Sequence, residues 1–255
     1  MEKKMYKSVE LLVGSKLLRG CVRAPEGEGP FPAVCFFHGF SVDKIGLMRL
    51  HELFARRCVN EGFACVRFDF YGCGESEGDF NEMRFSDEVE QAKAIYSWTV
   101  DQNFADAQNV FLAGHSMGGA IVSMIAPLLQ PKGAILWSPG NSAYYDISER
   151  VHAIPGHYKD FYDIGGLALS GAFLSEIRAI DMVKEAEGYN TEVLLIHGEK
   201  DEKIPISSIG LYLDMYGKNL TTEIIWGANH QFSSLDWKQQ VYDKSIEYLK
   251  RRVSQ

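Results

Sequence analysis

A serine flanked by two glycines is the residue of this chain whose setting best indicates chemistry. Residues 114–118 read Gly-His-Ser-Met-Gly, which is the pattern G-x-S-x-G. The pattern joins an apolar run of strand type (110–113) to one of helical type (120–129), so Ser116 is expected at a sharp strand-to-helix turn. The glycines permit this turn, and the turn exposes the serine hydroxyl as a nucleophile. A nucleotide-binding turn fits less well, because no G-x-G-x-x-G follows the first strand.

A serine nucleophile needs a base, and His230 is the histidine best placed for this task. It comes just after the expected strand 222–227, so it should lie at the same edge of the sheet as Ser116. His115 adjoins the serine but should point away from it on so sharp a turn. The other five histidines end earlier strands, lie on a charged helix or fall in the long segment after Ser138. A loop histidine that only caps the next helix is the plain alternative for His230.

The base in turn needs a carboxylate, and Asp201 is favoured over Glu199 and Glu202. All three follow the apolar run 192–198, at the end where a strand should reach the site. Asp201 has the shorter side chain and lies just before a proline turn. The chain order serine, aspartate, histidine is one of the orders in which such triads occur.

Two backbone N–H groups are expected to bind the oxyanion that forms in acyl transfer. One belongs to Met117, directly after the nucleophile. The other should come from the loop after the apolar run 33–37, where Gly39 lets the backbone approach and Phe40 supplies the N–H. An ordinary turn glycine is the alternative for Gly39. Cys73 is a poor rival nucleophile, because no histidine is near it in the sequence.

Short apolar runs of β type alternate with helical patterns along most of the chain. The expected strands are 8–13, 16–24, 32–39, 63–70, 109–114, 133–139, 192–198 and 222–227, and the expected helices are 47–62, 85–100, 117–129, 207–216 and 236–252. The first two strands should form an antiparallel hairpin. The alternation after them predicts an α/β fold with a mostly parallel sheet of about eight strands and helices on both faces.

One segment interrupts this alternation. About fifty residues separate Ser138 from the strand that starts near Glu192, and an ordinary crossover needs far fewer. We therefore expect a core made of residues 1–139 and 189–255, with residues 140–188 inserted as a cap over the carboxyl edge of the sheet. A two-helix crossover with a long loop is the alternative, but long loops without structure are uncommon in compact domains.

The composition is that of a globular protein without a polyanionic partner. Hydrophobic residues make up 46% of the chain and charged residues 24%, and the net charge is -8, so no nucleic-acid partner is expected. The N-terminus lacks the apolar core of a signal peptide, and no run of about 18 apolar residues predicts a membrane span. The five cysteines include no C-x-x-C, so reduced thiols in the cytoplasm are expected, rather than disulfides or a zinc site.

Five segments in order, "FFHGF", "RFDFYGCGESEG", "GHSMGG", "LLIHGEKDEKIP" and "GANHQF", resemble the α/β-hydrolase superfamily. Within it the chain looks most like the bacterial feruloyl/cinnamoyl esterases, which share the H-G-F and D-F-x-G-x-G-x-S segments and carry a cap. The resemblance implies a serine esterase without cofactor or metal, which cleaves small hydroxycinnamate esters. Ser116 would attack, His230 would be the general base, and Asp201 would orient it. The N–H groups of Phe40 and Met117 would hold the oxyanion.

The resemblance also implies that polar groups of the cap bind the phenol ring, for which Tyr145 and Asp146 are the candidates. A homodimer is expected from the resemblance alone. Cys73 departs from the family, which often has histidine there; this puts loop contacts in doubt but not the triad. Aromatic residues of the cap suit a flat acyl group, although ordinary packing explains any one of them: Tyr144, Tyr145, Phe161, Tyr162 and Phe173.

Three other functions compete with this one. A lipase-like hydrolase or acyltransferase would act on aliphatic acyl esters such as monoacylglycerols. A peptidase is less favoured, because the chain has no separate domain to gate its substrates. A non-catalytic binder with a hydrolase fold would predict a broken triad, whereas every part is present in this sequence.

Overall fold

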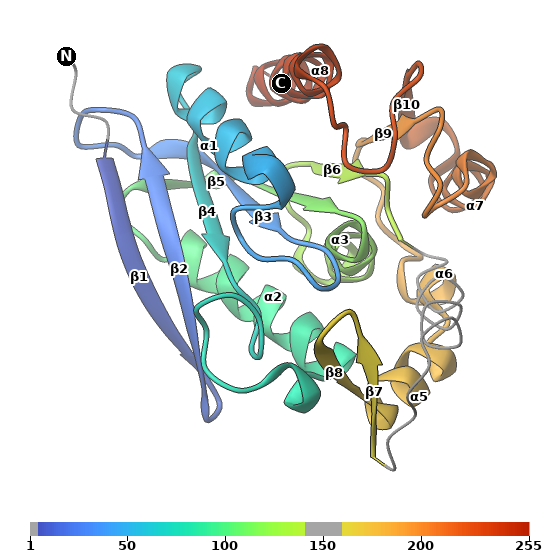
Figure 1. Ribbon diagram of the computed structural model, residues 1–255. Helices are drawn as coiled ribbons and strands as arrows, with labels where there is room; N and C mark the ends of the chain where they lie inside the picture. The colour runs from blue at the N-terminus through green and yellow to red at the C-terminus, as the bar shows by residue number, and fades with distance from the viewer. Residues whose placement is uncertain (1–4, 141–159, 255) are drawn as a thin grey trace.

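The fold is built around one eight-stranded sheet (Figure 1). The structure is a computed structural model and describes residues 5–140 and 160–254. The strands of the sheet are β1 (Met5–Val13), β2 (Lys16–Ala24), β3 (Phe31–Phe37), β4 (Ala64–Phe68), β5 (Ala105–His115), β6 (Ala134–Trp137), β9 (Val193–Gly198) and β10 (Leu220–Ile225). Their order is β1-β2-β4-β3-β5-β6-β9-β10, with antiparallel pairing from β1 to β4 and parallel pairing from there to β10. The predicted α/β fold with a mostly parallel sheet is therefore confirmed.

Helices cover both faces of the sheet, as the alternating pattern predicts. The helices of the core are α1 (Leu50–Asn60), α2 (Phe85–Val100), α3 (Met117–Leu129), α7 (Ile209–Tyr216) and α8 (Leu235–Val253), and the short 3-10 turns are η1 (Leu47–Arg49), η2 (Phe80–Glu82), η3 (Ile206–Ser208) and η4 (Gly217–Asn219). Helices α1 and α8 lie on one face, and α2 and α3 lie on the other (Figure 1). The sheet is thereby buried between two hydrophobic clusters.

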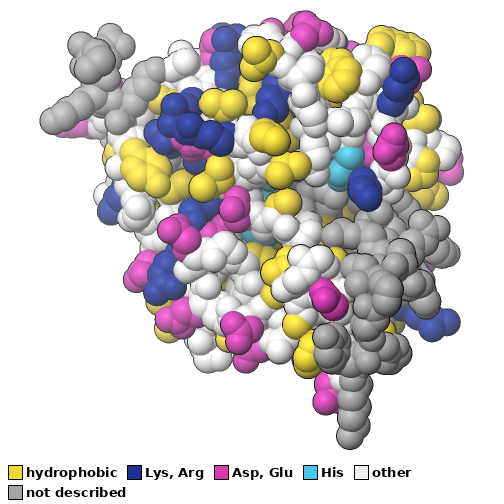
Figure 2. Space-filling view, in the orientation of Figure 1, with side chains coloured by type: hydrophobic (Ala, Val, Ile, Leu, Met, Phe, Trp, Pro, Cys, Tyr) yellow, Lys and Arg dark blue, Asp and Glu magenta, His cyan; other side chains and the backbone are white. Residues whose placement is uncertain are grey.

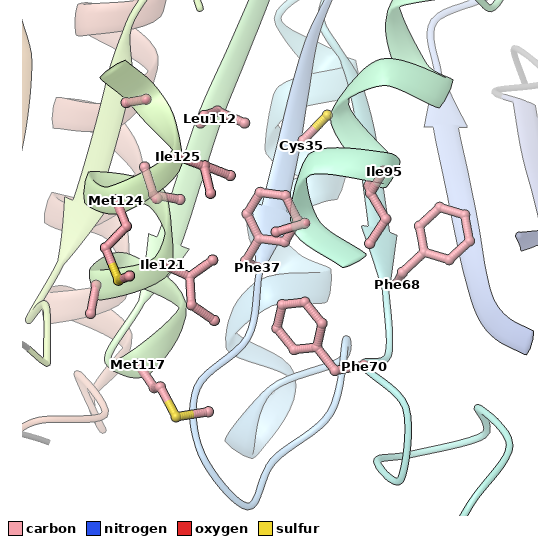
Figure 3. Close-up of a cluster of buried hydrophobic side chains, with 14 of the residues drawn as sticks. Cys35, Phe37, Phe68, Phe70, Ile95, Leu112, Met117, Ile121, Met124 and Ile125 are labelled. Atoms are coloured by element: carbon pink, nitrogen blue, oxygen red, sulfur yellow. The ribbon is translucent and has the colours of Figure 1, made fainter. Parts of the chain in front are cut away.

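Strand β5 contributes to both clusters because successive side chains of a strand point to opposite faces. Phe111 belongs to the cluster under α1 and α8, and Leu112 belongs to the cluster under α2 and α3. Figure 3 shows the second cluster, in which Phe37 of β3 lies with Ile95 of α2 and Ile121 of α3. Each large apolar side chain buried in this way stabilises the fold by about 1.5–3 kcal/mol. Burial on both faces explains the nearly continuous apolar runs of the central strands.

The helix expected to begin at Leu47 begins instead at Leu50. Met48 and Arg49 have φ angles of 49° and 61°, in the left-handed region, so the chain from Leu47 forms only the 3-10 turn η1. Apolar spacing alone carries no information about these two backbone angles, and this is why the predicted helix was too long.

The chain between β6 and β9 contains elements outside the main sheet. Strands β7 (Phe161–Ile164) and β8 (Leu167–Ser170) form an antiparallel hairpin, and α5 (Gly171–Ala179) and α6 (Met182–Glu185) follow it. Polar contacts join this part to the start of α2: Arg84 Nη1 donates to Ser170 Oγ at 2.9 Å, and Ser86 Oγ donates to Glu176 at 3.1 Å. The division into a core and a cap at 140–188 remains a proposal, which these elements support.

Candidate active site

Ser116 lies between the end of β5 and the start of α3, in a backbone conformation that only a tight turn requires. Its φ and ψ angles are 57° and −124°, which strain a residue with a side chain. A Cβ at Gly114 would lie 2.2 Å from the carbonyl oxygen of Gly118, and a Cβ at Gly118 would lie 2.3 Å from that of Phe37. The two glycines of the motif are therefore required by close backbone contacts.

His230 meets Ser116 from the chain between β10 and α8. Its Nε2 lies 3.0 Å from Ser116 Oγ, and its Nδ1 lies 2.7 Å from Asp201 Oδ2. A carboxylate can only accept, so Nδ1–H donates to Asp201 and Nε2 is left to accept the serine proton. The structure thus brings together the three side chains that the sequence selected, in the geometry of a nucleophile, a base and an orienting acid.

The carboxyl of Asp201 is held ionised by its neighbours. Burial by itself raises its pKa, but the hydrogen bond and charge of His230, with the N–H groups of Ile204 and Lys203, lower the pKa below its usual value. Those two N–H groups donate to Oδ1 at 2.8 and 2.9 Å. An ionised Asp201 is the form that can stabilise a positively charged His230.

Of the two carboxylates that rivalled Asp201, one accepts a backbone N–H and the other is exposed. Glu199 Oε2 accepts the N–H of Gly227 at 2.8 Å, which ties the end of β10 to the end of β9. Glu202 is exposed. Of the three, Asp201 is the carboxylate in contact with His230.

The loop after β3 comes close to the serine, as expected for an oxyanion loop. A Cβ at Gly39 would lie 2.9 Å from Ser116 Cβ, so a larger residue would push the loop away. His38 fixes this loop, because its Nδ1–H donates to the carbonyl of Gly39 at 2.9 Å and its Nε2 accepts the N–H of Phe70 at 3.1 Å. The loop after β3 therefore begins next to the nucleophile, and the role of the Phe40 N–H in binding the oxyanion remains a proposal.

A buried ion pair that the sequence did not predict supports the same loop. Lys44 donates to Asp69 through its backbone N–H at 2.7 Å and through Nζ at 2.5 Å, and Nζ also contacts Glu75 at 2.7 Å. Lys44 and Asp69 are 7% and 0% exposed, so this pair lies in the interior. The available signal was an aspartate directly after a strand that is apolar except for Arg67, since a buried carboxylate needs a partner.

The remaining residues that the sequence suggested for the site either pack in the interior or fall outside the residues that the structure describes. Burial raises the pKa of the Cys73 thiol well above its usual value, so the thiol stays protonated and unreactive. Phe173 of α5, which lies in the proposed cap, is fully buried, and its ring stacks on that of Phe40 in the loop after β3, with centroids 5.5 Å apart. Tyr145 and Asp146, the candidate ligands of the phenol ring, fall outside the described residues.

Histidine is nearly absent from the surface that Figure 2 shows, and only small patches of it are visible. Each histidine of the described chain is 7% exposed or less. In the same part of the chain, no three His, Cys, Asp or Glu side chains converge in a way that could hold a metal ion. Every helix described there is also too short or too polar to cross a bilayer.

Residues 29–159 match the family described as "Serine aminopeptidase, S33". The chain belongs to this family. A solved structure of Est1E from Butyrivibrio proteoclasticus with bound ferulic acid is similar in fold, with a TM-score of 0.85, 21% identity and coverage of 97% of this chain and 100% of that one. The α/β-hydrolase fold expected from the sequence motifs is thereby confirmed.

Curated relatives match a smaller share of this chain than Est1E does. An uncharacterized 31.7 kDa Escherichia coli protein is 32% identical over 39% of this chain, and the match spans only 34% of that protein's length. A putative esterase/lipase of Mycoplasma pneumoniae is 24% identical over 76% of this chain and 81% of its own length.

Proposed function

We propose that this protein is a serine-dependent carboxylic ester hydrolase that works through an acyl-enzyme. The observation that carries the proposal is the contact of Ser116 Oγ with His230 Nε2 at 3.0 Å, while Nδ1 of the same ring lies 2.7 Å from Asp201. A serine made nucleophilic in this way attacks carbonyl carbon.

In the proposed reaction, His230 Nε2 takes the proton of Ser116 as Oγ bonds to the ester carbonyl carbon. The N–H groups of Phe40 and Met117 stabilise the oxyanion. The His230 proton then passes to the leaving alcohol as the ester C–O bond breaks, which leaves the acyl group on Ser116. Water, deprotonated by His230, attacks this acyl-enzyme, and the acid departs as the proton returns to Ser116. No cofactor enters these steps.

We further propose that the preferred substrates are small esters of hydroxycinnamic acids. The motifs that resemble feruloyl esterases support this preference, and the likeness to Est1E agrees with it at the level of fold. Tyr145 and Asp146 remain the proposed contacts of the phenol ring, as parts of the proposed cap. The second candidate is an aliphatic acyl ester, which the match to a Mycoplasma pneumoniae esterase/lipase favours.

The nucleophile is tested with Ser116→Ala, for which kcat should fall by at least roughly 10³-fold while the fold is kept. Ser123→Ala is a matched control, because Ser123 lies on α3 and its hydroxyl bonds the carbonyl of Ala120 at 2.7 Å and the side chain of Tyr216, neither of which belongs to the site. A reactive phosphonate should label the native chain and the control but not the Ser116 variant. Activity retained in Ser116→Ala would refute the mechanism.

The substrate is tested with a panel of methyl ferulate, chlorogenate, p-nitrophenyl butyrate, a monoacylglycerol and an aminoacyl p-nitroanilide. A hydroxycinnamate esterase should give its highest kcat/KM on the first two compounds. Preference for the butyrate or the monoacylglycerol would favour the aliphatic candidate, and turnover of the anilide alone would indicate a peptidase. No turnover and no labelling would favour a binding protein.

A further inference from the structure

His115 precedes the proposed nucleophile, yet its imidazole makes its contacts on the face of the sheet that α1 and α8 cover. It is 2% exposed, and its ring centroid lies 6.2 Å from that of Phe232, a member of the cluster under those helices. Its Nε2 lies 2.9 Å from the backbone carbonyl oxygen of His230. Because a carbonyl oxygen can only accept, Nε2 must carry the proton and donate.

The protonation state of His115 is fixed by its surroundings. Burial, assisted by the neighbouring imidazole of His230, lowers the pKa of His115 to about 3. A neutral ring with a proton on Nε2 has Nδ1 free to accept, and Nε2 of His51 lies 3.4 Å from that atom. Burial also holds the pKa of His51 well below its usual value. Two neutral histidines therefore lie next to the His230 backbone: His115 of β5 contacts its carbonyl, and His51 of α1 contacts His115.

The carbonyl that His115 binds belongs to a part of the chain with little regular structure. His230 lies between the end of β10 at Ile225 and the start of α8 at Leu235. Its imidazole must meet two partners at once, at 2.7 and 3.0 Å. Within the described residues, the bond from His115 is the hydrogen bond found on the His230 carbonyl. A change in the position of this carbonyl would move the ring, and a misplacement of about 1 Å can cost about 10²-fold in rate.

We propose that His115 is a positioning residue: its Nε2–H holds the His230 backbone and thereby sets the imidazole between Ser116 and Asp201. This role rests on the proposed serine mechanism. The residue before the nucleophile would thus affect catalysis by positioning His230, from the face of the sheet that α1 and α8 cover.

Two variants of His115 separate hydrogen bonding from packing. His115→Gln keeps an N–H donor close to the position of Nε2, whereas His115→Leu fills similar space without a donor. For His115→Leu, we expect kcat on p-nitrophenyl butyrate to fall about 10- to 100-fold, with KM changed by less than about threefold. His115→Gln should keep kcat within about fivefold of the native value. Phosphonylation of Ser116 should slow in parallel with kcat.

Phe111→Leu is the control for loss of packing, because Phe111 lies four residues before His115 on the same face of the same strand, and its ring packs against that of Phe63. It should lower Tm and leave kcat unchanged at a temperature where all variants are folded. Native kcat in folded His115→Leu, equal losses in the Leu and Gln variants, or an equal loss in Phe111→Leu would each overturn the proposal. If the native chain neither hydrolyses esters nor reacts with the phosphonate, the proposed function itself fails instead.

Discussion

Several single residues of this protein, all buried histidines, make its free energy of unfolding depend on pH in the acid range. Burial is the main cause that lowers the pKa of four of them, His38, His51, His115 and His197. In the unfolded chain a histidine titrates near about 6.5. Below that pH the unfolded chain binds protons that the folded chain does not, so the free energy of unfolding decreases as the pH falls.

We predict that His115→Gln flattens this dependence on pH. The native chain should lose the contribution of His115 progressively from about pH 6.5 downward, towards its folded pKa of about 3. The variant lacks this group, so its free energy of unfolding should fall with a slope smaller by up to about one proton. Urea unfolding at a series of pH values measures both slopes. Equal slopes would mean that His115 is protonated in the folded state.

At the scale of elements, helix α2 places an ionisable side chain, the carboxyl of Glu88, in the interior. Glu88 is fully buried, and neither of its carboxyl oxygens has a hydrogen-bond partner among the described residues. Burial raises its pKa well above the usual value, with the nearby Asp87 acting in the same direction. The carboxyl is therefore protonated in the folded state and ionised in the unfolded state at neutral pH, which costs stability as the pH rises.

We predict that Glu88→Gln stabilises the protein, and more strongly at higher pH. The amide has the shape of the protonated carboxyl but cannot ionise, so the gain at neutral pH should be about 1 kcal/mol or more. Glu90→Gln is the matched control, because Glu90 lies on the same helix, is exposed and pairs with Lys93 at 2.7 Å. Thermal unfolding of both variants at two pH values tests this. A gain that does not grow with pH would contradict a protonated Glu88.

At the scale of the whole molecule, the last helix of the chain covers one face of the sheet. Tyr242 of α8 donates to the carbonyl of Leu50 at 2.8 Å, and Trp137 of β6 donates to Ser245 at 3.0 Å. Leu249 on the same helix is fully buried in the cluster that contains Phe111 of β5. Helix α8 therefore joins α1 and the central strands into one core, while the site lies at the sheet edge.

We predict that Leu249→Ala lowers stability without changing the chemistry. Loss of the buried side chain and the cavity left behind should reduce the free energy of unfolding by about 2–5 kcal/mol. The variant should keep the native kcat wherever it is folded, because Leu249 lies near the carboxyl end of α8, whereas His230 precedes the start of that helix. Urea unfolding and ester hydrolysis, measured together below the midpoint, check both statements. A drop in kcat of the folded variant would show that α8 also controls the site.

Residues whose roles depend on local pattern were predictable from the sequence. The G-x-S-x-G turn needs only its two neighbouring glycines and the runs on either side, and His230 and Asp201 were selected because each follows an apolar strand. Parallel strands end at one edge, so a strand-end position is enough to bring such residues together. The mostly parallel sheet and the covering of both its faces followed from the same alternation, whereas the order of the strands came from the structure.

Tertiary structure alone decided those contacts between distant segments that a position at the end of a strand does not indicate. The contact of His51 with His115 spans 64 positions, the Lys44–Asp69 pair spans 25, and both depend on which helix or loop lies against which strand. The left-handed backbone at Met48, which shortened α1, and the complete burial of Glu88 were equally invisible in residue spacing. Spacing determines which face of an element a side chain occupies. What lies opposite that face is determined by packing of the whole chain, because only packing sets burial and with it the protonation of the groups inside.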